Sequence, residues 1–299
     1  MARIGFLIVL LLAPFVALAQ DGTSHTAPAP VAAGIPPELP SASTRFKAVR
    51  IILIGDSTVQ VNSGWGGSFC AYHVLSVVAC IDLARGGRST SSYRAEHSWE
   101  IALDEMKSGG YVATYVLIQF GHNDQPGKPG RSTDLATQFP ANLRHYVEDT
   151  RAAGAIPVLI TPLTRREFIR GKLDNTLLPW ADAVRKVTAE MNVPLLDLNA
   201  DSAAAIQAMG PQTAMSLAQA QPSAEVFDAA ASGTTIAAQT GAAPRTPVMQ
   251  DNASVEPQGD PKRAFDYTHL GVTGADYFSQ MVASELARAI PALRRDLLP

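Results

Sequence analysis

Five short apolar runs lie between residues 48 and 198, and none has the strict alternation of a strand with one solvent face. They span residues 48–54, 77–83, 114–120, 156–161 and 193–198. Such unbroken runs, rich in β-branched residues, are typical of strands buried on both faces of a parallel sheet. The pattern predicts five strands in this order.

Patterns of helical period separate these strands. Helices are expected over residues 94–106, 135–153 and 179–191, and a last helix from a cap at Thr273 to about Ile290. Strands that alternate with helices predict an α/β fold, with a parallel sheet covered by helices on both faces.

Residues 203–259 break the alternation, because they are rich in Ala, Gln, Thr and Pro. Only residues 203–220 have a helical pattern. Residues 221–262 are therefore expected to form a long loop or insertion. Loops of this length are uncommon and often functional, and a tolerated surface insertion is the alternative to a lid.

The amino terminus has the pattern of a secretory signal peptide. Arg3 precedes an apolar stretch over residues 4–18, which ends in Ala17-Leu18-Ala19 before polar residues. One charge, an apolar core and a small-x-small site predict cleavage after residue 19, and an uncleaved anchor is the alternative. A flexible leader is expected over residues 20–44, and one catalytic domain over 45–299. The protein is then secreted or periplasmic, with no membrane span after signal removal.

The amino-acid composition argues against several classes of protein. The chain has 24 Lys+Arg and 27 Asp+Glu residues, a net charge of −3, and 46% hydrophobic residues. The apolar content excludes general disorder, and the weakly acidic balance argues against nucleic acid or anionic lipid as a partner. Two cysteines exclude a disulfide scaffold or a four-thiolate zinc site.

Polar clusters directly follow three of the predicted strands. They are Gly55-Asp56-Ser57-Thr58, Gly86-Gly87-Arg88-Ser89 and Gly121-His122-Asn123-Asp124. Ligands of open parallel sheets bind beyond the carboxyl ends of the strands, so these clusters are expected to meet at one edge. A fourth cluster, Asp266-Tyr267-Thr268-His269, precedes the last helix.

These clusters contain the residues of a serine hydrolase site. Ser57, at a turn between strand and helix, suits a nucleophile, although a serine there can equally be a helix cap. His269 suits the general base, and Asp266 the anion that orients it. The alternatives for this pair are a helix-entry cap beside a surface imidazole, or two ligands of a metal site.

A tetrahedral oxyanion needs hydrogen-bond donors, and the same clusters offer three. They are the backbone N–H groups of Ser57 and Gly87 and the carboxamide of Asn123. An ordinary turn glycine, and an Asn bonded to its own backbone, are the alternatives.

In this order, Gly55-Asp56-Ser57, Gly87, Gly121-His122-Asn123-Asp124 and Asp266-x-x-His269 resemble the four blocks of the SGNH (GDSL-type) hydrolases. Residues 64–66 (Gly-Trp-Gly), Arg88-Ser89 with Tyr93, and Thr268-His269-Leu270 resemble the rhamnogalacturonan acetylesterase branch.

The resemblance implies a flavodoxin-like, three-layer α/β/α sandwich with a five-stranded parallel sheet. It implies a catalytic triad of Ser57, His269 and Asp266, an oxyanion hole of Ser57, Gly87 and Asn123, and no metal or cofactor. It also implies an esterase that removes acetyl groups from a pectic polysaccharide. The expected partner is therefore an acetylated poly- or oligosaccharide, bound by a monomer.

Several neighbouring residues have two interpretations. Arg88, Arg165 and Arg166 either meet anionic uronates or form surface salt bridges. Trp65 either stacks on a sugar or lies in the core. His122 and Asp124 are expected to hold their loop rather than to act in catalysis.

Cys70 and Cys80 are ten residues apart, and a disulfide is favoured over two free thiols in an exported chain. Asn252-Ala253-Ser254 is a glycosylation sequon, which has meaning only in a eukaryotic secretory pathway.

Three functions remain open. The leading hypothesis is an exported carbohydrate acetylesterase. A lipase or thioesterase would need a wide acyl pocket instead, and a polysaccharide-binding module with a vestigial site is of another class.

Overall fold

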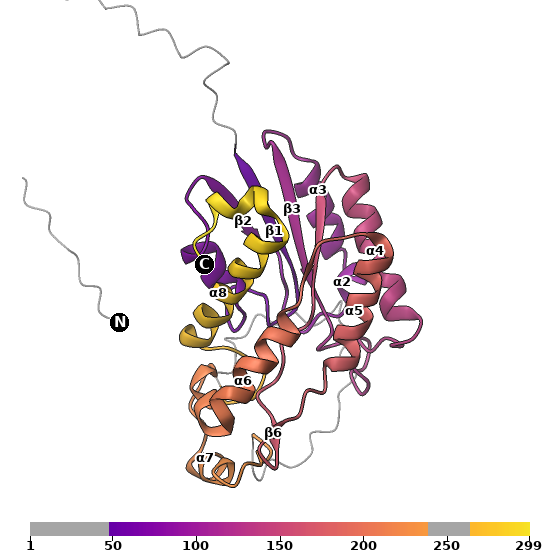
Figure 1. Ribbon diagram of the computed structural model, residues 1–299. Helices are drawn as coiled ribbons and strands as arrows, with labels where there is room; N and C mark the ends of the chain where they lie inside the picture. Colours follow the sequence, from indigo (N-terminus) through magenta and orange to yellow (C-terminus); the bar gives the residue numbers. More distant parts are fainter. Residues whose placement is uncertain (1–47, 239–263) are drawn as a thin grey trace, which may run out of the picture. The chain divides into compact units, whose positions relative to one another are not determined.

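A five-stranded parallel sheet forms the centre of the computed structural model, which describes residues 48–238 and 264–299 (Figure 1). The strand order is β2-β1-β3-β4-β7. The strands are β1 (Val49–Gly55), β2 (Val78–Asp82), β3 (Ala113–Gln119), β4 (Ile156–Ile160) and β7 (Leu195–Leu196). The predicted five-stranded parallel sheet is thereby confirmed.

The last strand is shorter than the expected run of residues 193–198. Only Leu195 and Leu196 pair with β4, opposite Leu159 and Ile160. Pro194 has no N–H to donate to a ladder, and Leu198 already begins a helix. The apolar run therefore belongs to two elements instead of one.

Helices cover both faces of the sheet, which gives three layers (Figure 1). On one face pack α1 (Gly66–Tyr72), α6 (Leu198–Ala214) and α8 (Val272–Ala289), and the other face carries α2 (Ser92–Ala95), α3 (Ser98–Lys107), α4 (Gln138–Ala152) and α5 (Leu178–Met191). Along β1, Ile51 and Leu53 enter the first core, while Ile52 and Ile54 enter the second. Both sets are buried, which explains the absence of polar alternation.

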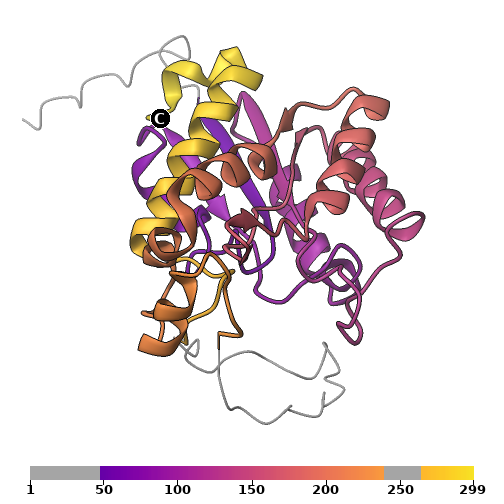
Figure 2. The ribbon, with the colours of Figure 1, turned by 60° about the horizontal axis from the view of Figure 1, so that its bottom comes forward.

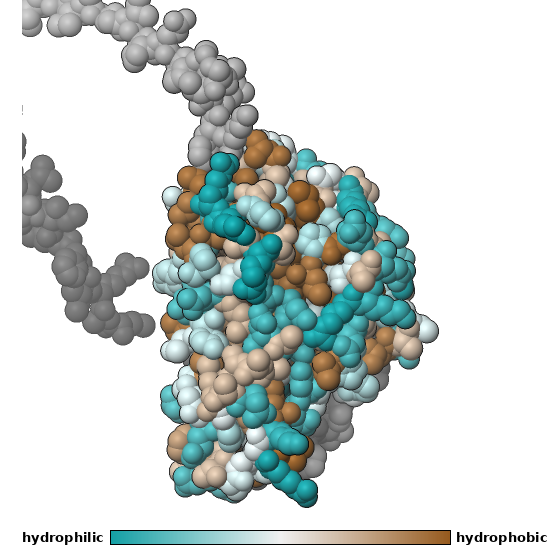
Figure 3. Space-filling model, in the orientation of Figure 1, coloured by the Kyte–Doolittle hydropathy of each residue, from teal (hydrophilic) through white to brown (hydrophobic). Residues whose placement is uncertain are grey.

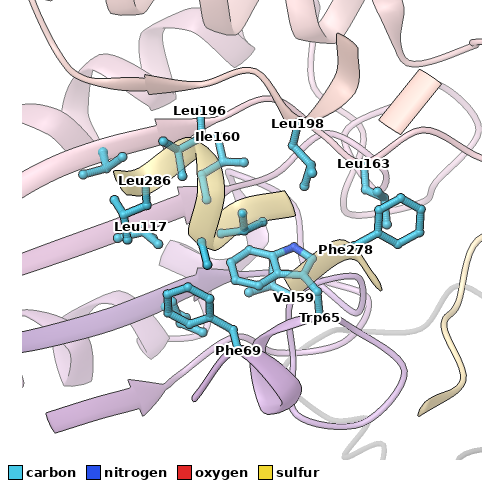
Figure 4. Packing of buried hydrophobic residues seen from close by; sticks show 14 of the residues in the cluster. Val59, Trp65, Phe69, Leu117, Ile160, Leu163, Leu196, Leu198, Phe278 and Leu286 are labelled. Atoms are coloured by element: carbon cyan, nitrogen blue, oxygen red, sulfur yellow. The ribbon is translucent and has the colours of Figure 1, made fainter. Parts of the chain in front are cut away.

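Trp65 is a core residue. Its side chain is fully buried and packs edge-on against Phe69, near Val59 and Phe278 (Figure 4). Its indole N–H donates to Gln119 Oε1 at 3.1 Å. The hypothesis that it stacks on a sugar is therefore wrong.

Two helix starts differ from expectation. His97 has a left-handed backbone (φ 65°), which separates α2 from α3, so the expected helix of residues 94–106 becomes two. Gly271, not Thr273, precedes α8, and Thr273 lies inside its first turn. The N–H of Gly271 is bound to Leu217 O, and its carbonyl accepts from Ala275 N.

Residues 203–238 contain more secondary structure than the single helix and long loop that were expected. Helix α6 begins at Leu198 and is interrupted at Gly210 (φ 74°), before a 3₁₀ turn, η2 (Met215–Leu217). Helix α7 (Ala224–Ala230) lies within the expected long loop of residues 221–262, so that prediction is wrong for this segment. Ser223 Oγ caps α7 by accepting from Val226 N. Residues 231–238 contain no further helix or strand, and residues 239–262 of the expected loop lie outside the described residues.

Besides η2 and α7, the elements that were not predicted are α1, a short hairpin of β5 (Phe168–Ile169) and β6 (Lys172–Leu173), and the closing 3₁₀ helix η3 (Pro291–Asp296). In Figure 1 the strands run from the top of the view downward, and β6 and α7 lie beyond their carboxyl ends. Figure 2 turns this end of the sheet toward the viewer.

The Cys70–Cys80 disulfide is confirmed, and it ties α1 to the edge strand β2. The expected signal peptide, leader and Asn252 sequon lie outside the described residues. No helix in the described part has the length and apolarity needed to cross a membrane. On the face drawn in Figure 3, hydrophilic and hydrophobic residues are interspersed.

Candidate active site

Ser57 lies in a tight turn at the carboxyl end of β1. Asp56 shapes this turn, since its Oδ1 accepts from the N–H and the hydroxyl of Thr58 at 2.9 and 2.8 Å. Gly55 is required before it, because a Cβ there would lie 2.5 Å from Val59 Cγ2 and 2.6 Å from Gln119 O. The close packing of β1 on β3 thus presents the Ser57 hydroxyl at the sheet edge.

His269 lies between Ser57 and Asp266. Its Nε2 is 2.8 Å from Ser57 Oγ, and its Nδ1 is 2.7 Å from Asp266 Oδ2. The predicted nucleophile, base and orienting anion therefore meet, although 212 positions separate Ser57 from His269 along the chain.

Asp266 is held as a carboxylate. Burial alone would raise the pKa of Asp266, but the hydrogen bond and charge of His269, together with two backbone N–H groups, lower it to about 2. Those N–H groups belong to Thr268 and His269, at 2.8 and 2.7 Å from Oδ1. An ionised carboxylate only accepts hydrogen bonds, so Nδ1 of a neutral His269 carries the ring proton and Nε2 is left to accept from Ser57.

Arg166 holds the loop of Asp266 and His269 by hydrogen bonds to its backbone. The side chain is fully buried and donates to the carbonyl oxygens of Asp266, Thr268 and His269 at 3.1, 3.3 and 2.8 Å. Burial lowers the pKa of Arg166 to about 10, so it stays charged at neutral pH. Neither the uronate contact nor the surface salt bridge considered for it is correct.

The other two arginines differ from each other. Arg88 is also buried, pairs with Glu96 at 2.8 Å and donates to Gly86 O, so its salt bridge is internal instead of superficial. Arg165 is only partly buried and bonds the hydroxyls of Thr268 and Thr176. It has no carboxylate within ion-pair distance among the described residues, and it remains available to an anion.

The three expected oxyanion donors lie at the ends of β1, β2 and β3. Gly87 has a left-handed backbone (φ 79°), which favours glycine. Within the described residues, the backbone N–H groups of Ser57 and Gly87 have no acceptor. Asn123 is buried, and one N–H of its carboxamide donates to Arg88 O at 3.1 Å.

Asp124 holds its loop by hydrogen bonds, as expected, whereas His122 does not. Asp124 accepts from the N–H and hydroxyl of Thr90 and from the hydroxyl of Thr133, which joins the loops after β2 and β3. Burial raises the pKa of Asp124 to about 7. His122 is buried with Nδ1 3.5 Å from Asp56 Oδ2, and burial lowers its pKa. Neither ring nitrogen has a hydrogen-bond partner within the described residues, so the expectation that His122 bonds its loop is not confirmed.

A hollow of about 520 Å³ opens beside the His269 loop. Its lining includes Ser63, Tyr72 and Leu270, and the Tyr72 side chain is well exposed. Ser63 also bonds Ser57 O at 3.2 Å. Neither Ser57 nor His269 lines the hollow. No group of three or more His, Cys, Asp or Glu side chains able to hold a metal occurs in residues 48–238 and 264–299.

Residues 53–217 match the model of the GDSL-like Lipase/Acylhydrolase family. The matched segment contains Ser57, Gly87 and Asn123. This chain belongs to that family. The match ends before Asp266 and His269, whose place in the site comes from the geometry described above.

Two relatives place this family member in the branch expected from its motifs. Rhamnogalacturonan acetylesterase RhgT of Bacillus subtilis (strain 168) is 34% identical over 174 residues, which cover 56% of this chain and 72% of RhgT. The protein named "Probable rhamnogalacturonan acetylesterase YesY", from the same organism, is 34% identical over 157 residues, 50% of this chain and 70% of YesY. The resemblance to the rhamnogalacturonan acetylesterase branch of SGNH hydrolases is confirmed.

A solved structure shares the fold. Protein YXIM from Bacillus subtilis superposes with a TM-score of 0.55 at 20% identity, over 81% of this chain and 57% of that one. The present chain therefore spans little more than half of the length of YXIM.

The contacts of two arginines with site residues were not predicted from the sequence. Arg166 binds the carbonyls of the His269 loop, and Arg131 donates to Gly87 O. Arg166 was considered only as a substrate or surface residue, and Arg131 lies in the loop after β3 but outside the polar cluster of residues 121–124. Nothing in the periodicity of the chain marks either one.

Proposed function

We propose that this protein is a serine esterase that removes acetyl groups from a carbohydrate. The observation that carries the proposal is the continuous hydrogen-bonded path from Ser57 Oγ through His269 to Asp266. An imidazole so oriented activates a hydroxyl as a nucleophile. The family membership and the names of the two relatives support an acetyl ester as the bond that is cleaved.

The first half-reaction forms an acetyl-enzyme. Ser57 Oγ bonds to the acetyl carbon while its proton moves to His269 Nε2, and the carbonyl electron pair moves onto oxygen. The N–H groups of Ser57, Gly87 and Asn123 stabilise this oxyanion. The bond to the sugar oxygen then breaks, and that oxygen takes the proton from His269.

The second half-reaction regenerates Ser57. Water bonds to the acetyl carbon as His269 Nε2 takes one of its protons, and the oxyanion forms again at the same donors. Collapse releases acetate and returns the proton to Ser57 Oγ. Asp266 stays ionised throughout and stabilises the imidazolium.

The substrate proposed is an acetylated pectic polysaccharide such as rhamnogalacturonan. Its support, besides the names of the relatives, is the set of cations beside the site. Arg131 bonds Gly87 O, Arg165 bonds the Thr268 hydroxyl, and Lys128 lies in the same loop as Arg131. Burial and the charges of these two arginines lower the pKa of Lys128. None of the three has a carboxylate partner within ion-pair distance in the described residues. Unpaired cations of one sign favour an anionic ligand.

We also propose that the protein is exported. The signal-peptide pattern supports this, and so does the Cys70–Cys80 disulfide, because disulfides persist in oxidising compartments.

The test begins with Ser57→Ala. We expect this variant to lose essentially all release of p-nitrophenol from p-nitrophenyl acetate while its circular dichroism spectrum stays that of the wild type. Labelling of the wild type, but not of Ser57→Ala, by a fluorophosphonate probe is the second expectation. Undiminished turnover in the variant would sink the assignment, and a wild type without labelling or activity would indicate a binding module.

The substrate is tested by acetate release from acetylated rhamnogalacturonan, acetylated xylan and p-nitrophenyl octanoate. We expect the highest kcat/KM on rhamnogalacturonan, falling as salt rises because salt screens the cations. Faster hydrolysis of the octanoyl ester would favour a lipase or thioesterase instead.

A further inference from the structure

Arg131 bridges two of the groups that form the proposed oxyanion hole. Its Nη1 is 3.2 Å from Gly87 O and 3.5 Å from Asn123 Oδ1, the second being at the outer limit of a hydrogen bond. Arg131 belongs to the loop after β3, whereas Gly87 follows β2. One guanidinium thus joins two loops that come from different strands.

The contact with Asn123 determines which way its carboxamide faces. Asn123 Nδ2 donates to Arg88 O at 3.1 Å, and Oδ1 faces Arg131. A 180° rotation of the carboxamide would set oxygen against the Arg88 carbonyl and N–H against a cation. Both contacts would become repulsive, so the carboxamide keeps this orientation. The second N–H of Nδ2 has no acceptor among the described residues and is left to donate to an oxyanion.

The contact with Gly87 acts on the backbone. Arg131 Nη1 donates to the carbonyl of Gly87, which belongs to the peptide unit after that residue. Arg88 Nη1 donates to the carbonyl of Gly86 at 2.8 Å, which belongs to the peptide unit before it. The peptide units on both sides of Gly87 are therefore held by arginines. The approach is close, because a Cβ at Gly87 would lie 3.3 Å from Arg131 Nη1.

We propose that Arg131 is a positioning residue of the oxyanion hole, which aligns the Asn123 carboxamide and the Gly87 loop before substrate binds. This inference rests on the proposed esterase function. A donor that is already aligned needs no reorganisation when negative charge develops on the oxygen, so its loss is felt in the transition state and not in substrate binding.

The experiment is a double-mutant cycle of Arg131→Gln and Asn123→Ala, with kcat and KM measured on uncharged p-nitrophenyl acetate. We expect Arg131→Gln to lower kcat about tenfold to a hundredfold, with KM changed by less than about twofold. Arg131→Lys is expected to recover part of the loss, since one ammonium can still reach one of the two oxygens. In the Asn123→Ala background, Arg131→Gln is expected to lower kcat by a smaller factor than in the wild type, because one of the two groups that it aligns is absent, while its contact with Gly87 O remains to be lost.

The matched control is Arg295→Gln, which removes an exposed arginine on η3 that contacts no site residue. Its kcat is expected to equal that of the wild type. If Arg131→Gln does not fold, as judged by circular dichroism, the same cycle is run with Arg131→Lys.

Additive losses in the cycle would overturn the positioning role. A raised KM with unchanged kcat would assign Arg131 to substrate binding instead. An active wild type with an equally active Arg131→Gln contradicts this inference alone, whereas an inactive wild type contradicts the proposed function and the inference with it.

Discussion

Ser57, Gly87 and Asn123 follow three adjacent strands, whereas Asp266 and His269 follow none. The first three residues make up the sheet side of the site, and their strands pair over most of their length, with Gly55 opposite Gln119 at the carboxyl end. Backbone ladder bonds therefore determine where each loop leaves the sheet. The loop of residues 266–269 has no such support.

Side chains and isolated backbone bonds hold this acid–base loop instead. Arg166 binds three of its carbonyls, Leu270 N donates to Ser63 O at 2.8 Å, and Gly271 N donates to Leu217 O at 2.9 Å. One half of the site therefore depends on a sheet shared by many residues, while the other depends on one buried guanidinium and a few isolated backbone hydrogen bonds. Single substitutions are therefore expected to act more severely on the acid–base loop.

The largest effect that would sharpen this comparison is expected from Asp266→Asn. An amide facing His269 Nδ1 donates a proton and reverses the tautomer, so Nε2 can no longer accept from Ser57. We expect kcat on p-nitrophenyl acetate to fall about 10⁴-fold, with a folded protein. A loss below about tenfold would mean that Asp266 does not orient the base.

An intermediate effect is expected from Arg166→Met. Three partly buried carbonyls lose their donor, which costs about 3 kcal/mol of unfolding free energy. The loop also loses its shape, so we expect kcat to fall about tenfold to a hundredfold and fluorophosphonate labelling of Ser57 to slow. Urea unfolding measures the loss of stability, and a time course of fluorophosphonate labelling measures the reactivity of Ser57.

Arg50→Met provides the matched control. Arg50 is as fully buried as Arg166 and bonds Thr114 and the carbonyls of Met106 and Ser108, but it lies near the start of β1, at the opposite end of the strand from Ser57. We expect a comparable loss of stability and an unchanged kcat for the folded fraction. Equal losses of kcat in both variants would break the comparison, since Arg166 would then act only through stability.

The smallest effect concerns α8, the helix that follows the acid–base loop. Burial and the charge of Asp201 raise the pKa of Glu285 to about 8, against an ordinary value of 4.5. The folded protein therefore binds this proton more tightly than the unfolded chain, and the stability it contributes is lost as the pH rises from about 4.5 toward 8. Glu285→Gln cannot ionise and avoids this loss.

We expect the Tm of Glu285→Gln to exceed that of the wild type by about 3 °C at pH 8, and to differ by less than about 1 °C at pH 4.5. Activity is expected to stay the same, because Glu285 faces the core and not the site. A Tm difference that does not change with pH would contradict the role of ionisation.

The sheet side of the site was predictable from sequence for a specific reason. Apolar runs that stop at Gly55, Gly86 and Gly121 mark strand ends, and parallel strands bring their ends to one edge. The Asp266–His269 pair was found from its chemistry and from the family resemblance, since its loop follows no strand.

Other features could not be read from local pattern. Trp65 carries no sign of whether it faces solvent or core, and Thr273 has the residue type of a cap without the backbone position. The α7 segment is short, and its helix begins at the Ser223 cap within a composition that is typical of loops. In each case packing against distant residues decided between states that local propensity leaves nearly equal in energy.

The sequence by itself determined which segments form the strands, which loops carry chemistry and which family this chain resembles, because periodicity, glycine positions and motif residues are local properties. Only the tertiary structure decided that Arg166 binds a loop 100 positions away and that Arg131 joins Gly87 to Asn123. A guanidinium can donate to any oxygen that the fold brings within reach. Its partner therefore depends on the packing of the whole domain and leaves no pattern in the neighbouring residues.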